Sequence, residues 1–152
     1  MLGEMSDEEY MRLALEEGRA AERAGEVPVG AAVVADGRVI ARAGNRTIRD
    51  CDPTAHAEMV ALREAARATA NYRLGGVTLY VTIEPCAMCA GAMIQARVAR
   101  LVYGADDPRG GAVRSCFSVL EHAALNHRVE VTAGVLAEEC GAAMKAFFAA
   151  KR

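Results

Sequence analysis

Two short segments of the chain bring together residue types that bind transition metals. One is residues 56–58 (HAE) and the other is residues 85–89 (PCAMC). Cys86 and Cys89 are three residues apart, so on a helix their sulfur atoms share one face. In the first turn of a helix, the N-terminal dipole also favours the thiolate form of cysteine. Because zinc prefers thiolate and imidazole ligands, His56, Cys86 and Cys89 are predicted to bind a zinc ion.

The number of protein ligands indicates what kind of zinc site this is. Structural zinc sites are closed by four protein ligands, whereas three ligands leave the last position of the tetrahedron to water, as in catalytic sites. Zinc lowers the pKa of such a water toward about 7, which makes hydroxide available at neutral pH. Glu58 is then predicted to transfer protons rather than to bind the metal. On a regular helix Glu58 would point roughly 200° away from His56, but the start of a helix can direct both side chains inward.

Other interpretations of the same residues remain open. A C-x-x-C pair can be a redox disulfide, although here it follows Glu84 and Pro85 rather than an aromatic residue. A zinc-stabilised binding module without catalysis would need the ligands but not Glu58. The other histidines and cysteines of the chain lack the spacing of metal ligands. We expect the histidines to have structural roles and the cysteines to be small buried hydrophobic side chains. They are His122, His127, Cys51, Cys116 and Cys140.

Composition places these motifs in one globular domain, residues 1–152. The chain is 53% hydrophobic and 25% charged, and its length suits a single core. Its net charge of −2 argues against non-specific nucleic-acid binding over the whole surface, though not against a local basic region. Residues 27–35 are too few to span a bilayer, and the N-terminus is acidic where an export signal needs positive charge. We therefore expect a cytoplasmic protein without a membrane segment.

Alternating strand and helix patterns predict an α/β fold, specifically a three-layer α/β/α sandwich. A helix is expected from Ser6 to about Ala24, with a capping box formed by Ser6 and Glu9 and a stop at Gly25. An Asp36-Gly37 turn predicts a hairpin, which makes the five-stranded sheet mixed rather than parallel. The remaining expected segments are strands at 29–35, 38–43, 77–83, 100–104 and 129–132, and helices from Thr54 (as N-cap) to 70, from Pro85, and at 136–150.

Beyond this reasoning, the sequence resembles a known family. The pattern H-x-E…P-C-x-x-C is an established signature of zinc deaminases. The likeness to the bacterial tRNA-specific adenosine deaminases, within the cytidine/deoxycytidylate deaminase superfamily, extends along nearly the whole chain. It rests on residues 45–46, 52–58, 71–74, 79–94, 126–128 and 147–148.

The resemblance implies a cytidine-deaminase-like fold, a homodimer and one zinc ion per subunit. It implies a hydrolase of tRNA processing and RNA editing that converts adenosine to inosine at the wobble position of the tRNA anticodon. It makes His56, Cys86 and Cys89 the metal ligands and Glu58 the acid and base. A free nucleobase or nucleoside deaminase, acting on guanine, cytosine or cytidine, shares the zinc motif and is the alternative.

The same resemblance implies which residues contact the substrate. Asn45 and the backbone of Ala57 would hydrogen-bond the flipped base, and Val29 and Ile83 would line its pocket. The positions that would contact the rest of the anticodon loop are Arg46, Asp107, Arg109, Phe148 and the basic end 151–152.

An acidic chain that binds tRNA must concentrate its positive charge. We therefore expect Arg46, Arg109, Lys151 and Arg152 to cluster near the mouth of the metal site, with the acidic residues of the first helix facing away.

Overall fold

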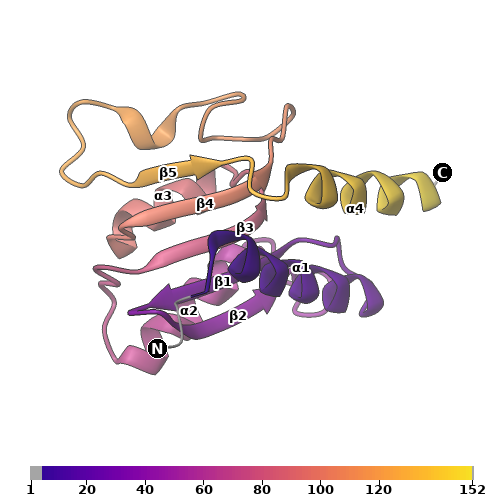
Figure 1. Cartoon of the computed structure of the whole chain (residues 1–152), viewed down its shortest axis with the longest axis horizontal. Coiled ribbons are helices and arrows are strands. Elements are labelled where there is room, and N and C mark those ends of the chain that lie inside the picture. The colour runs from indigo at the N-terminus through magenta and orange to yellow at the C-terminus, as the bar shows by residue number, and fades with distance from the viewer. Residues whose placement is uncertain (1–4, 152) are drawn as a thin grey trace.

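A computed structural model describes residues 5–151 of the chain. Within them, helices and strands alternate after an opening helix and hairpin (Figure 1). The elements are α1 (Asp7–Arg23), β1 (Gly30–Ala35), β2 (Arg38–Gly44), α2 (Ala57–Thr69), β3 (Thr78–Ile83), α3 (Ala87–Ala96), β4 (Arg100–Ala105), the 3₁₀ turn η1 (Val119–Glu121), β5 (Glu130–Ala133) and α4 (Ala137–Ala150).

The strands form one five-stranded sheet in the order β2-β1-β3-β4-β5. β1 is antiparallel to both β2 and β3, whereas β3, β4 and β5 run parallel. Hydrophobic residues pair across the sheet: Val33 with Leu79, Leu79 with Leu101, and Leu101 with the partly buried Val131. The predicted mixed sheet is confirmed.

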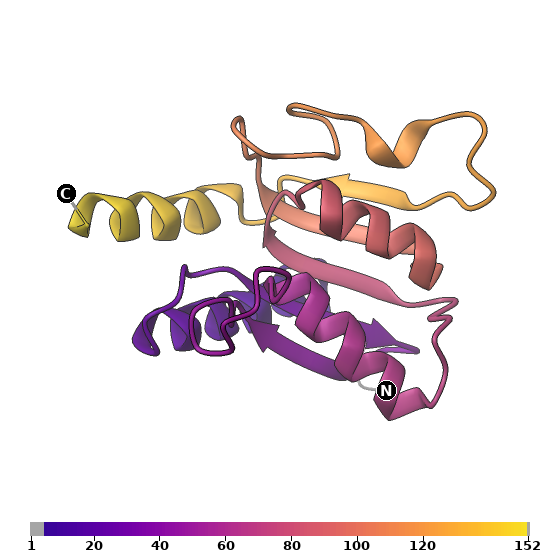
Figure 2. The same ribbon diagram turned by 180° about the vertical axis from the view of Figure 1, so that it is seen from behind.

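Helices cover both faces of this sheet. α1 and the first turn of α4 lie on one face, where Tyr10, Met11 and Cys140 are buried (Figure 1). α2 and α3 lie on the other face, over a larger core that includes Leu62 and Met93 (Figure 2). This arrangement confirms the three-layer α/β/α sandwich. The rest of α4 extends beyond the ends of the strands in both views.

Close packing of α1 on β1 depends on one glycine. A Cβ atom at Gly30 would collide with the backbone carbonyl of Ala14 in α1. The capping box that sequence predicts at the start of α1 is present, since the Glu9 amide donates to Ser6 Oγ and the Ser6 amide donates to the Glu9 carboxylate. The helix ends before Gly25, which has a φ of +89°.

Two helix starts differ from the prediction. Thr54 is not an N-cap, because its hydroxyl and its amide both donate to Asp52 Oδ1, at 2.7 and 2.8 Å. α2 instead begins at Ala57 with His56 as its N-cap, and α3 begins at Ala87 with Cys86 as its N-cap rather than at Pro85. Both helices therefore start later than expected, and the residue at each N-cap is a predicted metal ligand.

No helix in the described part of the chain is long and apolar enough to cross a membrane.

The start of α1 is tied to the sheet by a carboxylate. Asp7 accepts hydrogen bonds from the Arg100 guanidinium at 2.6 and 2.9 Å and from the Tyr80 hydroxyl at 2.7 Å. The hydrogen bond from Arg100 favours the charged carboxylate and outweighs burial, so the pKa of Asp7 lies below its ordinary value of 3.8.

We predict that Asp7→Asn lowers Tm by roughly 3 °C at pH 7, because a charge-assisted pair is lost. A carboxyl group with a depressed folded-state pKa stabilises the protein above its unfolded pKa and loses this effect as pH falls through the folded value. The Tm difference between wild type and variant should therefore be full above about pH 5 and shrink toward pH 2. Thermal unfolding followed by circular dichroism across this range measures it, and a difference that grows on acidification would contradict the assignment.

Candidate active site

The predicted metal ligands meet where the N-termini of α2 and α3 lie side by side. His56 Nδ1 is 3.5 Å from Cys86 Sγ and 3.6 Å from Cys89 Sγ, and the three ligand atoms lie within 4.8 Å of one another. A tetrahedral zinc ion with its usual bond lengths requires an N···S edge of about 3.5 Å. The three side chains therefore fit a zinc ion.

Charge at these thiols also suits a cation. Hydrogen bonds from Cys89 and His56 lower the pKa of the Cys86 thiol to about 3, despite burial. The pKa of the Cys89 thiol is raised because it shares a proton with Cys86 and is buried. The hydrogen bond to Cys86 raises the pKa of His56 in turn. Because metal ligands must be deprotonated, binding a metal would release the protons that these thiols carry.

Glu58 points into the same site. It is 4% exposed, and burial raises its pKa to about 7. The Cys89 thiol interacts with its carboxyl group. Because His56 is the N-cap, with an extended φ of −68° and ψ of 154°, it does not follow helical geometry, and Glu58 in the first turn converges on it. The expectation that a helix start can direct both side chains inward is consistent with this geometry.

Asn45 links the end of β2 to the start of α2. Its Oδ1 atom accepts a hydrogen bond from the Ala57 amide at 2.8 Å, and its own amide nitrogen in the backbone donates to the Val29 carbonyl at 3.2 Å. Asn45, Ala57 and Val29 are thus brought together, as the resemblance implies. Since the Ala57 amide is bonded to Asn45 Oδ1, the side-chain NH₂ group of Asn45 is the donor left to face a base.

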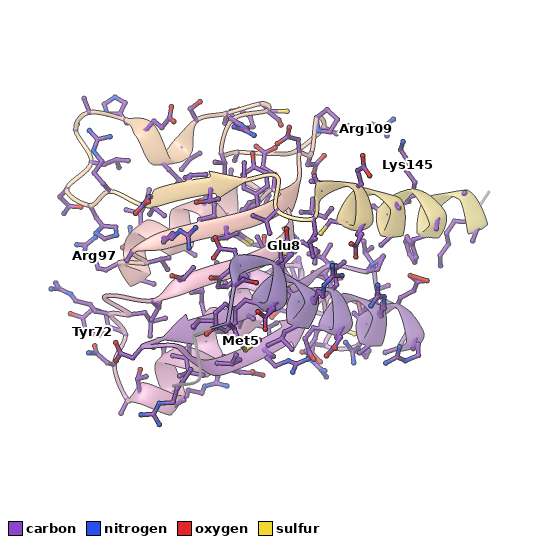
Figure 3. The ribbon with its side chains drawn as sticks, viewed as in Figure 1. Met5, Glu8, Tyr72, Arg97, Arg109 and Lys145 are labelled. Atoms are coloured by element: carbon purple, nitrogen blue, oxygen red, sulfur yellow. The ribbon has the colours of Figure 1, made fainter. Side chains whose placement is uncertain are left out.

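A cleft of about 940 Å³ lies between α4 and the loop after β4. Five of the predicted contact positions line it: Ile83, Asp107, Arg109, Phe148 and Lys151. Figure 3 shows Arg109 and Lys145 facing this cleft from the loop and from α4, at the opposite end of the molecule from Arg97. The remaining lining residues are Ala105, Asp106, Pro108, Gly141, Met144 and Ala149.

Of the basic residues expected to cluster at the mouth of the metal site, Arg109 and Lys151 line this cleft, whereas none of the predicted metal ligands lines it. Arg109, Lys145 and Lys151 line the cleft together with the carboxylates of Asp106 and Asp107. Lys145 was not predicted, although its position three residues before Phe148 places both on one face of a helix.

Arg46 does not join this cleft. It pairs with Asp50 at 2.9 Å and lines a separate cavity of about 160 Å³ beside Arg42 and Glu17. Acidic residues of α1 are neutralised away from the cleft, since Glu16 and Glu17 pair with Arg42 at 2.9 and 3.2 Å. Arg152 lies outside the described residues.

The other histidines and cysteines of the chain differ from one another. Cys140 is buried as expected, but Cys51 and Cys116 are exposed, so the prediction of small buried side chains was wrong for both. They lie in loops, where Cys51 adopts a φ of +48°. The two histidines have structural roles: His127 Nε2 lies 2.7 Å from the Val98 carbonyl, and His122 Nδ1 accepts from the Ala124 amide at 3.0 Å.

Glu84 was missed by sequence reasoning. It directly follows β3, is 3% exposed, and accepts hydrogen bonds from residues at both ends of the loop after β4. Burial raises the pKa of Glu84, but hydrogen bonds from the amides of Arg114, Ser115 and Asp107 and from the Ser115 hydroxyl outweigh it and bring it to about 2. The signal in the sequence was a carboxylate between a hydrophobic strand and the P-C-x-x-C segment.

Comparison with known proteins agrees with this geometry. Residues 5–152 match the family model of the MafB19-like deaminases. A tRNA-specific adenosine deaminase of Haemophilus influenzae is 51% identical over 147 residues, covering 96% of this chain and 85% of that protein. One of Bacillus subtilis is 49% identical over 142 residues, covering 93% of this chain and 88% of that protein.

Solved structures share the fold. One, from a study of A-to-I editing by tRNA:A34 deaminases at the wobble position, has a TM-score of 0.86 at 48% identity and covers 89% of this chain and 98% of its own. A guanine deaminase of Nitrosomonas europaea has a TM-score of 0.83 at 27% identity and covers 95% of this chain and 85% of its own. With a deaminase model matched along the described fold and relatives near 50% identity, the chain belongs to the family of tRNA-specific adenosine deaminases.

Proposed function

We propose that this protein hydrolyses adenosine to inosine at the wobble position of the tRNA anticodon, with one zinc ion per subunit. The observation that carries this proposal is the match at 51% identity over 96% of the chain to a tRNA-specific adenosine deaminase, together with the His56, Cys86 and Cys89 triad. An anticodon loop is single-stranded, so turning one base into a pocket costs only a few kcal/mol.

The chemistry divides between the metal and Glu58. His56, Cys86 and Cys89 would hold a zinc ion, which would supply a water activated for attack near neutral pH. Glu58 accepts one proton of the water as its oxygen adds to C6 of adenine, and it delivers that proton to N1. Glu58 then takes the proton of the hydroxyl group now on C6 and gives it to the amine there, so that the C–N bond breaks and adenosine and water give inosine and ammonia.

The surroundings provide recognition. The side-chain NH₂ group of Asn45 is placed to donate to the base, between Val29 and the start of α2. Asp107 Oδ1 accepts from the amides of Arg109 and Gly110, which leaves Oδ2 to accept a hydrogen bond from a ribose 2′-hydroxyl and thereby to favour RNA over DNA. Arg109, Lys145 and Lys151 suit phosphates, and Phe148, half exposed, suits a stacked base.

Arg46 enters this proposal only as a contact outside the cleft, because its guanidinium must leave Asp50 to reach RNA. A homodimer is what family membership implies, whereas cytoplasmic location and a single deaminase domain over 1–152 rest on the sequence. All three stay predictions.

The metal assignment predicts that His56→Ala retains less than about a tenth of the zinc bound by wild type, because two thiolates alone leave the site with too few ligands. Zinc per chain, measured by elemental mass spectrometry, checks this. His127→Ala is the matched control, since that histidine contacts the Val98 carbonyl and should keep one zinc per chain. Unchanged zinc in His56→Ala would show that the ligand set is wrong.

The role of Glu58 predicts that Glu58→Ala keeps the metal and the fold but lowers kcat by about 10³-fold or more, because both proton transfers lose their carrier. Glu64→Ala, on the exposed side of the same helix, should behave as wild type. Single-turnover inosine formation and zinc content are measured together. Full activity in Glu58→Ala would favour a zinc-stabilised binding module, and a reversible Cys86–Cys89 disulfide in place of metal would favour a redox protein.

The substrate is tested directly. Purified protein is incubated with an anticodon stem-loop carrying adenosine at the wobble position, and in parallel with free guanine, cytosine and cytidine. We expect inosine in the stem-loop and little conversion of the free compounds. The structural likeness to a guanine deaminase makes the opposite result the main alternative: release of ammonia from free guanine with the RNA unchanged would overturn the proposal.

A further inference from the structure

Glu84 carries a carboxylate that is enclosed by the loop after β4. Its Oε1 atom accepts from the Asp107 amide at 3.0 Å and from the Ser115 hydroxyl. Its Oε2 atom accepts from the amides of Val113 at 3.1 Å, Arg114 at 2.9 Å and Ser115 at 2.9 Å. One side chain thus holds both ends of the loop, and it satisfies four backbone amides that would otherwise need other partners.

The carboxylate is held by dipoles rather than by a cation. Among residues 5–151 no ion pair involves Glu84, and the nearby Arg114 guanidinium pairs with Asp106 instead, at 3.6 Å. The enclosure is tight, because a Cβ atom at Gly111 would collide with the carboxylate of Glu84. The adjacent Gly110 has ordinary space, with Asp107 Oδ2 as its nearest neighbour at 3.4 Å.

The loop that Glu84 holds forms one wall of the cleft. Asp106 through Arg109 line the cleft opposite α4. Asp107 is the first residue whose amide binds Glu84, and its own side chain then fixes the amides of Arg109 and Gly110. The position of the Arg109 backbone is therefore set through two successive carboxylates.

The same residue is joined to the metal site. Glu84 is two residues before Cys86, its amide donates to the Ala105 carbonyl at 2.8 Å, and the next carbonyl, that of Pro85, accepts from the Ala112 amide at 2.8 Å. The backbone that leads into the metal ligand and the carboxylate that shapes the cleft wall belong to one short segment. A shift of one would shift the other.

We infer that Glu84 is a positioning residue for RNA binding, which sets the distance between the metal site and the Asp107–Arg109 wall of the cleft. This inference rests on the proposed function, which supplies the substrate. In it, Glu84 affects binding of the anticodon loop rather than proton transfer. Removing a negative acceptor from five donors leaves buried amides without partners, so the loop must rearrange.

The first test is a split of kinetic constants for the stem-loop substrate. Glu84→Gln should raise KM by about tenfold or more and change kcat by less than about twofold, with zinc content unchanged, because the lost interaction serves binding. Asp7→Asn is the control, since it also removes a hydrogen-bonded carboxylate but lies at the start of α1. It should lower Tm and leave KM unaltered. Wild-type KM in a folded Glu84→Gln protein would overturn the inference.

Two glycines provide a second test if Glu84→Gln does not fold. Gly111→Ala pushes on the carboxylate without removing it and should also raise KM. Gly75→Ala, where a Cβ atom would meet nothing within 4 Å, should not. Equal KM values for the two alanine variants would contradict the positioning role.

Hydrogen exchange of the free protein gives a readout that needs no substrate. Glu84→Gln, or Gly111→Ala in its place, should speed exchange at the amides of Asp107, Val113, Arg114 and Ser115 but not in α2. Unchanged exchange there would overturn the inference even if the enzyme edits tRNA. Conversely, faster exchange with no inosine formed by wild type would reject the proposed function and keep the structural role of Glu84.

Discussion

The rest of the structure serves one contact, in which the imidazole of His56 meets the sulfur atoms of Cys86 and Cys89 where two helices begin. His56 and Cys86 are the N-cap residues of α2 and α3, and the backbone at each is extended. Three ligand atoms within 4.8 Å would be costly to assemble on flexible loops. Here the folded sheet and core already order these segments. β3 leads directly into the P-C-x-x-C segment, and both helices pack on the larger core.

Much of this could be predicted from the sequence. Strand boundaries followed from β-branched runs and the Asp36-Gly37 turn, and the start of α1 followed from the Ser6 and Glu9 pair. Residue type and spacing alone also indicated the group of His56, Cys86 and Cys89, whose ligand atoms the fold brings within 4.8 Å of one another. The helix starts at Thr54 and Pro85 were wrong. Thr favours the N-cap and Pro favours the first helical position, but Asp52 binds Thr54, and the N-caps are His56 and Cys86.

Residues whose role depends on three-dimensional neighbours could not be predicted in this way. Nothing in the local sequence indicates that Glu84 meets amides 23 to 31 positions later, or that Arg46 pairs with Asp50 rather than facing the cleft. Glu26 is a parallel case: it is fully buried and accepts from the amides of Ile48 and Arg49. Composition reveals a carboxylate, but only the fold reveals that its partners are backbone dipoles of a distant loop.

In α4, the residues that pack in the core and the residues that line the cleft belong to different parts of the helix. Only its first turn, through Cys140, is packed in the core, while Met144, Lys145 and Phe148 stand beyond the sheet and line the cleft. Substitutions on that outer part are thus released from the packing constraint that governs the rest of the chain. Under the proposed function, selection can alter which RNA shape the cleft accepts without destabilising the fold. The last turns of this helix are then a natural place for substrate specificity to diverge.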